Sequence, residues 1–195
     1  MLVPPPLSLY VHIPWCVQKC PYCDFNSHAL KTELPELDYI DALIDDLETD
    51  LMAYQLVNGQ RPLHSIFIGG GTPSLISPSE IGRVRAAMEN RIPFSDTIEI
   101  TMEANPGTVE AGRFDGYRQA GVNRISIGIQ SFQDDKLQRL GRIHGSQEAI
   151  KAIELAKSAG LNSFNTDLMH GLPDQSIADA ISDLKQAIAL DPPHL

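Results

Sequence analysis

Apolar positions along the chain follow two spacings, and each spacing predicts a different element. Segments in which every second residue is apolar are typical of β-strands, and apolar residues three or four positions apart are typical of helices. The first spacing predicts five strands, over Ser8–His12, Ser65–Ile68, Thr97–Glu103, Arg124–Ile129 and Ser163–Leu168. The second predicts a helix after each strand, over Glu36–Val57, from Pro78, over Val109–Ala120, from Ser146 to Gly160, and from Ser176 to the residue before Pro192.

Capping residues indicate where several of these helices begin and end. Ser77, followed three residues later by Glu80, is the pattern of a capping box, in which each of the two side chains accepts a backbone N–H from the other residue. Ser146 and Ser176 are the predicted N-caps of the last two helices. Gly121 is the predicted C′ residue that ends the third helix, because glycine readily adopts the left-handed conformation found there.

Strands that alternate with helices through short loops predict an α/β protein with a parallel sheet. Five βα units are present, and either a doubly wound sheet or a (β/α) barrel accommodates them. They are long enough together to bury a sizeable core. Residues 190–195 have the composition of a turn that leads into a sixth strand, so we expect the chain to be a fragment of a longer protein.

Composition and charge narrow the class of protein. The 195 residues are 43% hydrophobic, 21% charged and 6% aromatic, which is typical of one globular domain. A formal net charge of −10 argues against a nucleic-acid-binding surface. No apolar run reaches the about 18 residues that a membrane span needs, and residues 1–9 lack the positive charge of a signal peptide. We expect a cytoplasmic protein without a transmembrane segment.

Cys16, Cys20 and Cys23 lie within eight residues just after the first predicted strand, and the chain has no other cysteine. Their odd number and their clustering favour metal binding over disulfide formation. Three thiolates on one short loop can bind three corners of a [4Fe–4S] cluster and leave the fourth iron open. A zinc site completed by His12 or His28 is the alternative, although zinc sites of this kind usually use two separated cysteine pairs.

The residues around these cysteines carry a family resemblance. The stretch from Tyr10 to Cys16 (YVHIPWC), continued by Cys20 to Cys23 (CPYC), resembles the signature of the radical S-adenosylmethionine (SAM) superfamily. More narrowly, it resembles the oxygen-independent coproporphyrinogen III oxidase-like family. Four later segments resemble this family in the same order: GGGTP at Gly69–Pro73, EANP at Glu103–Pro106, SIGIQSF at Ser126–Phe132 and DLMHGLP at Asp167–Pro173. Each follows a predicted strand, at the face where a parallel α/β barrel carries its active site.

The resemblance implies a fold, two cofactors and a set of binding residues. The implied fold is a partial (β/α) barrel of the radical SAM type, with five of an expected six βα units in a core domain over residues 1–195. This core domain would be truncated at its C-terminal end, and the family's C-terminal domain would be absent. The implied cofactors are SAM and a [4Fe–4S] cluster on Cys16, Cys20 and Cys23. The residues implied to contact SAM are Tyr10, Tyr22, Gly70, Gly71, Thr72, Glu103, Gln130, Arg142 and Asp167.

Physical reasons accompany several of these roles. Glycines at 69–71 lack Cβ atoms, so their backbone can approach SAM closely, and Glu103 can pair with the ammonium group of SAM. Tyr22 can lie near the adenine or shield the cluster from water, and both can hold. Tyr10 contacts SAM or packs in the core, and Arg142 contacts SAM or is a surface charge at a helix end. The sequence leaves open whether one or two SAM molecules bind.

Two types of protein in this family have to be distinguished. The oxidases decarboxylate coproporphyrinogen III in haem biosynthesis and carry a further cysteine two residues after the third, where this chain has Phe25. They also have a longer segment before the position of Tyr10, which only nine residues precede here. Both departures favour the second type, a haem-binding chaperone that delivers haem to proteins such as respiratory enzymes. We therefore expect radical SAM cofactors and haem as cargo, without coproporphyrinogen III dehydrogenase activity.

A third class, a plain iron–sulfur or zinc module without SAM chemistry, also fits the cysteine pattern. Anaerobic reconstitution distinguishes this class from a radical SAM protein, because the spectrum of a plain metal-binding module would not change when SAM is added. The sequence leaves open the haem acceptor, the use of radical chemistry and the formation of a homodimer, and it assigns no catalytic residue. The haem ligand is expected beyond Leu195.

Overall fold

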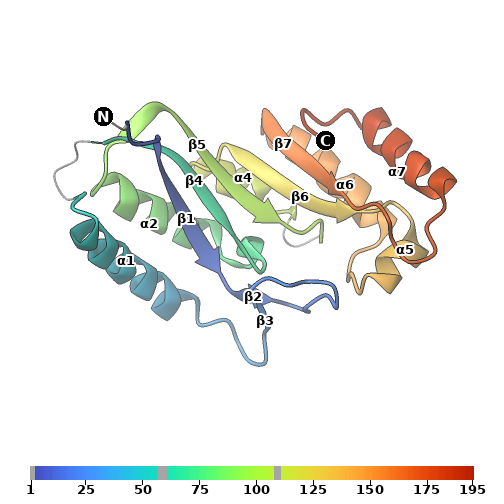
Figure 1. The fold of residues 1–195 in the computed structure, drawn as a ribbon, viewed down its shortest axis with the longest axis horizontal. Helices are drawn as coiled ribbons and strands as arrows, with labels where there is room; N and C mark the ends of the chain where they lie inside the picture. Colours follow the sequence, from blue (N-terminus) through green and yellow to red (C-terminus); the bar gives the residue numbers. More distant parts are fainter. Residues whose placement is uncertain (1–2, 57–60, 108–110) are drawn as a thin grey trace.

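The computed structural model describes residues 3–56, 61–107 and 111–195. A five-stranded sheet forms its centre, and every neighbouring pair of strands is parallel (Figure 1). In spatial order the strands are β1 (Leu7–Ile13), β4 (Leu63–Gly70), β5 (Phe94–Ala104), β6 (Arg124–Gln130) and β7 (Ser163–Leu168). This order follows the sequence, whereas a doubly wound sheet reverses its order at a switch point. The predicted α/β fold is therefore confirmed as an open, barrel-like sheet with β1 and β7 at its edges.

Helices connect the strands and cover one face of the sheet (Figure 1). The main helices are α1 (Glu36–Ala53), α2 (Pro78–Glu89), α4 (Phe114–Gln119), α6 (Ser146–Ser158) and α7 (Ile177–Ala189). Shorter elements lie in the loops after β1, β4 and β6, namely β2 (Trp15–Cys16), β3 (His28–Ala29), η1 (Pro73–Leu75) and α5 (Asp134–Arg139). None of the helices in the described ranges is long and apolar enough to cross a membrane.

The alternation of side chains along the strands separates a buried face of the sheet from an open one. Along β6, Ile125, Ile127 and Ile129 are fully buried, whereas the polar and glycine residues between them are half-buried. The buried residues pack against apolar residues of α1, α2, α4 and α6 in one continuous core. Polar side chains are consequently left on the other face, and those near the carboxyl ends of the strands are available to a ligand.

Two of the predicted N-caps are confirmed. Ser77 caps α2, because its Oγ accepts the N–H of Glu80 at 3.4 Å. The N–H of Ser77 donates to Glu36 of α1, however, so the capping box predicted with Glu80 is only half-formed. Ser176 caps α7 with a complete box, since Ser176 and Asp179 exchange two hydrogen bonds of 3.1 and 2.9 Å.

The prediction that Ser146 caps α6 is wrong. The N-cap is Gly145, whose N–H donates to Glu148 Oε2 at 3.0 Å, and Ser146 is the first helical residue. The N–H of Ser146 donates to Asp134 Oδ1 at 2.7 Å, at the beginning of α5. The sequence did not predict α5, because its six residues (DDKLQR) show no helical spacing of apolar positions.

Element boundaries differ from the predicted ones by a few residues. Strand β4 continues through Gly70, two residues past its predicted end, and β5 begins at Phe94, three residues before its predicted beginning. Gly121 follows α4 with a φ of 101°, as predicted for a C′ glycine. Helix α1 ends at Ala53, before the predicted end at Val57. Val57 itself and Val109, the predicted beginning of the third helix, lie outside the described residues.

Candidate functional site

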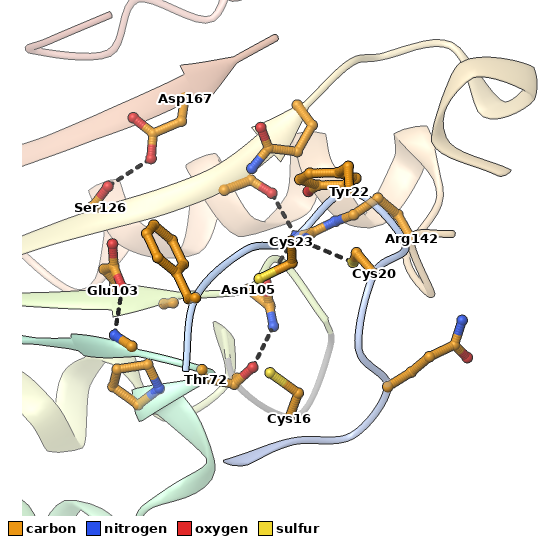
Figure 2. Close-up of a pocket in the computed structure, with 18 residues that line it drawn as sticks. Cys16, Cys20, Tyr22, Cys23, Thr72, Glu103, Asn105, Ser126, Arg142 and Asp167 are labelled. Atoms are coloured by element: carbon orange, nitrogen blue, oxygen red, sulfur yellow. Dashed lines mark hydrogen bonds between the residues drawn. The ribbon is translucent and has the colours of Figure 1, made fainter. Parts of the chain in front are cut away.

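A cavity of about 310 Å³ opens at the carboxyl ends of β4, β5, β6 and β7 (Figure 2). Residues 16–25, which we call the cysteine loop, contribute to its wall. Eleven of the twelve residues assigned to cofactors by sequence line this cavity, namely Cys16, Cys20, Tyr22, Cys23, Gly70, Gly71, Thr72, Glu103, Gln130, Arg142 and Asp167. Asn105 and Ser126, to which the sequence analysis assigns no role, line it too. The parallel sheet gathers these distant segments because all its strands end at the same edge.

The cysteine loop is folded by hydrogen bonds of its own backbone and one lysine. Cys23 N–H donates to Cys20 O at 3.0 Å, and Lys19 Nζ donates to Phe25 O at 3.1 Å and to Ser27 O at 3.0 Å. The three cysteines are free thiols on the wall of one cavity. Across the described ranges, no group of three or more His, Cys, Asp or Glu side chains is arranged to hold a metal ion. The three thiols share the wall of the cavity without forming such a group.

Residues 69–72 at the end of β4, which we call the glycine turn, lie against the chain that leads into the cysteine loop. A Cβ on Gly70, whose φ is 115°, would come within 2.6 Å of the His12 ring and 2.9 Å of Ile13 O. A Cβ on Gly71 would lie 2.5 Å from Trp15 O. The sequence predicts glycine here for the close approach of SAM, and the structure adds a reason that needs no ligand. Their Cβ positions are already taken by this chain, so glycine is required even without a ligand.

Glu103, at the end of β5, places its carboxylate at the glycine turn. The N–H of Gly70 donates to Glu103 Oε2 at 3.1 Å. Burial raises the pKa of Glu103, the hydrogen bond from Gly70 lowers it, and the nearby Asp167 carboxylate raises it further. A carboxylate that is short of solvent and close to a second one favours the approach of a cation. Met102, next to it, is fully buried and faces the core, as the alternation of β5 predicts.

Arg142 lies in the cavity and not on the outer surface of a helix end. Its Nη2 donates to Asn105 Oδ1 at 2.7 Å and to Gly128 O at 2.8 Å. Asn105 Nδ2 in turn donates to Thr72 Oγ1 at 3.1 Å (Figure 2). Asn105 therefore connects the loop after β4 with Arg142, a role that its position after a strand would permit but that no sequence pattern specifies.

Tyr22, between the second and third cysteines, lies beside Arg142 and Cys20. Burial raises the pKa of the Tyr22 hydroxyl, and the positive charge of Arg142 acts in the opposite direction. Tyr22 is 41% exposed, so it lies at the mouth of the cavity and not in the core. This position allows both predicted roles, contact with a ligand and shielding of the cysteine loop from water.

Strands β6 and β7 carry a hydrogen-bonded cluster of polar side chains, of which Ser126 and Asp167 line the cavity. Ser126 Oγ donates to Asp167 Oδ2 at 2.7 Å, and Asn165 Nδ2 donates to Asp167 Oδ1 at 2.7 Å and to Ser126 Oγ at 2.9 Å. Gln130 adopts a φ of 69° at the end of β6, and its carbonyl accepts the N–H of Met169 at 2.9 Å. The carboxylate of Asp167 is thus held by two neighbouring side chains and faces the opening.

Tyr10 is the one predicted residue that does not line the cavity. It is 55% exposed, which also argues against the alternative that it packs in the core. Its ring stacks on Phe67 with a centroid distance of 6.2 Å. Its hydroxyl donates to His12 Nδ1 at 2.8 Å, because His12 Nε2 is the donor to Asn26 O at 2.8 Å. His12 therefore links Tyr10 to the chain just after the cysteine loop, and both of its ring nitrogens are occupied.

His144 is a buried histidine behind Arg142. Its Nε2 donates to Ile129 O at 3.1 Å, and burial together with the charge of Arg142 lowers its pKa to about 4. In the unfolded chain the ring titrates near about 6.5, so the unfolded state binds more protons between the two values and stability is lost as the pH falls through this range. A depression of this size corresponds to about 3 kcal/mol.

We expect the free energy of unfolding to fall between about pH 6.5 and pH 4 in the parent protein, and to fall less in His144→Gln. Glutamine can keep the hydrogen bond to Ile129 but does not titrate. Urea unfolding across this pH range measures the difference, with exposed His64→Gln as the matched control. Parallel pH profiles for the parent and His144→Gln would contradict the prediction.

Comparison with known proteins gives one matching family and several close relatives. Residues 10–186 match the radical SAM superfamily. The chain is 64% identical to the haem chaperone HemW of Haemophilus influenzae and 62% identical to that of Escherichia coli, each over 98% of this chain and 50% of the relative. It is 37% identical to HemW of Bacillus subtilis over 96% of this chain and 48% of the relative. The chain thus spans about half the length of these relatives.

Among solved structures, the coproporphyrinogen III oxidase HemN of Escherichia coli, a radical SAM enzyme, is similar to this chain with a TM-score of 0.81. The two are 29% identical, and the match covers 96% of this chain and 42% of that one. The methylornithine synthase PylB shares the fold, with a TM-score of 0.62 and 13% identity over 96% of this chain and 51% of that one.

Proposed function

The chain belongs to the radical SAM superfamily, and from this premise we propose that it is the cofactor-binding core of a haem chaperone that holds a [4Fe–4S] cluster and SAM. The observation that carries the proposal is the gathering of three free thiols, the glycine turn and the carboxylate of Glu103 around one cavity. The names of its relatives at 64% and 62% identity support the choice of a haem chaperone.

The residues of the cavity fit the proposed cofactors. Thiolates are the ligands that iron–sulfur clusters take, and Cys16, Cys20 and Cys23 offer three of them beside open space. When bound, such a cluster supplies an electron for cleavage of the SAM sulfonium, and that chemistry belongs to the cofactors. A volume of about 310 Å³ lies at the lower end of the range for small-molecule sites.

The remaining wall of the cavity would hold and orient SAM. Glu103 would pair with the ammonium group, because its carboxylate is half-buried and its hydrogen bond comes from the uncharged backbone N–H of Gly70. The backbone of Gly70, Gly71 and Thr72 would lie along the methionine part. Gln130 and Asp167 would offer polar atoms from the far wall, and Tyr22 a ring for the adenine. In this proposal Tyr10 supports the site indirectly. Its hydroxyl binds His12, and His12 binds the residue that follows the cysteine loop.

The haem chaperone is favoured over the oxidase by Phe25. Phe25 is 63% exposed at the cavity, and it occupies the position where the oxidases carry a further cysteine. The proposed cargo is haem, and the proposed partners are haem-accepting proteins such as respiratory enzymes. Free thiols fit a reducing compartment such as the cytoplasm. The second candidate is the coproporphyrinogen III oxidase, which the TM-score of 0.81 with HemN favours.

The test combines four measurements on the anaerobically reconstituted full-length protein. We expect a [4Fe–4S] spectrum, a change of that spectrum when SAM is added, saturable haem binding, and no decarboxylation of coproporphyrinogen III. Robust decarboxylation would replace the chaperone with the oxidase. Tightly bound zinc with no response to SAM would identify a plain metal-binding module, and absent haem binding would contradict the proposed cargo.

A further inference from the structure

Arg142 reaches one of the three cysteines from a segment far along the chain. Its Nη1 lies 3.8 Å from Cys20 Sγ, within the range of a hydrogen bond to sulfur, and Figure 2 shows this contact beside those of Nη2. Nη2 uses its two hydrogens on Asn105 Oδ1 and Gly128 O, so the plane of the guanidinium is fixed from the opposite side. The cation is therefore held against the sulfur by the sheet and not by the cysteine loop.

The residue before Arg142 binds the same part of the cysteine loop. Gly141 O accepts a hydrogen bond from Gln18 Nε2 at 3.2 Å and lies 3.8 Å from Cys20 Sγ. Gly141 has a φ of 69°, and a Cβ there would come within 2.7 Å of Pro21 Cδ. The turn after α5 thus contacts residues 18, 20 and 21 in a close fit.

The position of Arg142 is also coupled to the glycine turn. Asn105, which accepts from Arg142, donates to Thr72 Oγ1 at 3.1 Å, and its own N–H donates to Ser74 Oγ at 3.4 Å. A line of hydrogen bonds consequently runs from the loop after β4, through Asn105 and Arg142, to the sulfur of Cys20. Arg142 Nε is buried without a hydrogen-bond partner, so the guanidinium has been desolvated to reach this place.

We propose that Arg142 is a positioning residue for Cys20 that orients its sulfur and raises the reduction potential of the cluster bound there. Hydrogen bonds and positive charge at a ligating sulfur stabilise the more negative, reduced state of an iron–sulfur cluster. A cation fixed in a partly desolvated place acts more strongly than one in water. This role leaves Arg142 able to contact SAM as well, because Nη1 has a second hydrogen that is free to bind a ligand. It rests on the proposed function only in that Cys20 binds a cluster.

The test compares three variants of the reconstituted protein without SAM. R142Q removes the charge and the fork of donors, R142K keeps the charge but cannot bind Cys20, Asn105 and Gly128 together, and R139Q is the matched control. Arg139 is also a cation on the α5 segment, but it is partly exposed and pairs with Asp174. The measurement is the midpoint potential from a redox titration followed by electron paramagnetic resonance, together with the iron content.

We expect R142Q to lower the equilibrium constant for reduction about tenfold, which is about 59 mV for a one-electron couple. R142K should fall between R142Q and the parent, and R139Q should equal the parent. A fully loaded R142Q with the potential of the parent would overturn the proposal, and so would an equal shift in R139Q.

If R142Q folds but holds less than a full cluster, Asn105→Ala supplies the decisive measurement. It keeps the guanidinium and removes one of the two acceptors that fix it, so a smaller shift in the same direction is expected. An unchanged potential in N105A would then overturn the proposal. A parent protein that binds no cluster would contradict the proposed function and not the role of Arg142, so the two failures are distinguishable.

Discussion

Alanine in place of Cys16, Cys20 or Cys23 is expected to abolish assembly of a complete [4Fe–4S] cluster. All three thiols line the same cavity, and the chain has no other cysteine to replace a lost ligand. Alanine is smaller than cysteine and fits each site without strain, so the fold should persist. Iron and sulfide analysis after anaerobic reconstitution measures the effect, with circular dichroism to confirm folding.

The matched control is Val17→Ala within the same loop. Val17 is 52% exposed between the first two cysteines, and its truncation removes apolar volume without removing a ligand. Full iron and sulfide content is expected for this variant. The ligand assignment is wrong if any one of the three cysteine variants reaches the iron content of the parent.

Gly71→Ala is expected to lower both the free energy of unfolding and the affinity for SAM. The added Cβ would lie 2.5 Å from Trp15 O and 2.8 Å from Trp15 C, and backbone atoms cannot rotate away as a side-chain end can. The N–H of Gly71 donates to Ile13 O, and that of Thr72 to Trp15 O, both at 2.7 Å, so the displacement would break the junction of β1, the cysteine loop and β4. Overpacking of this kind costs about 1–3 kcal/mol or more. Urea unfolding and a SAM titration of the reconstituted protein measure the two effects.

Gly82→Ala is the control for the same chemical change at a tolerant site. Gly82 lies inside α2, and a Cβ there would meet Ala120 Cβ at 3.6 Å, an ordinary van der Waals contact. Alanine in a helix interior should stabilise the protein by about 0.5–1 kcal/mol. If Gly71→Ala proved as stable as Gly82→Ala and bound SAM as the parent does, the close packing of β4 on the cysteine loop would be refuted.

The sequence by itself determined the βα order, the parallel sheet and the grouping of the site residues. Alternation of apolar residues is set by the geometry of a strand, and parallel strands joined by helices must end at one edge. The motifs that contain Cys16, Glu103 and Asp167 could therefore be placed at one edge of the sheet from their positions at the ends of predicted strands, and the family resemblance implied what these residues bind. The helix caps at Ser77 and Ser176 were predictable for the same reason, because a cap is a contact between residues three positions apart.

Only the tertiary structure decided features that depend on contacts between distant segments. Glycine is required at position 71 because Trp15 O occupies the place of a Cβ. The capping box at Ser77 is half-formed because its N–H donates to Glu36 of another helix. Tyr10 lies beside the cavity because its hydroxyl binds His12. The sequence around a residue does not show which atoms of distant segments will pack against it. Such contacts arise when helices and strands pack together, and that packing is determined by the whole chain at once.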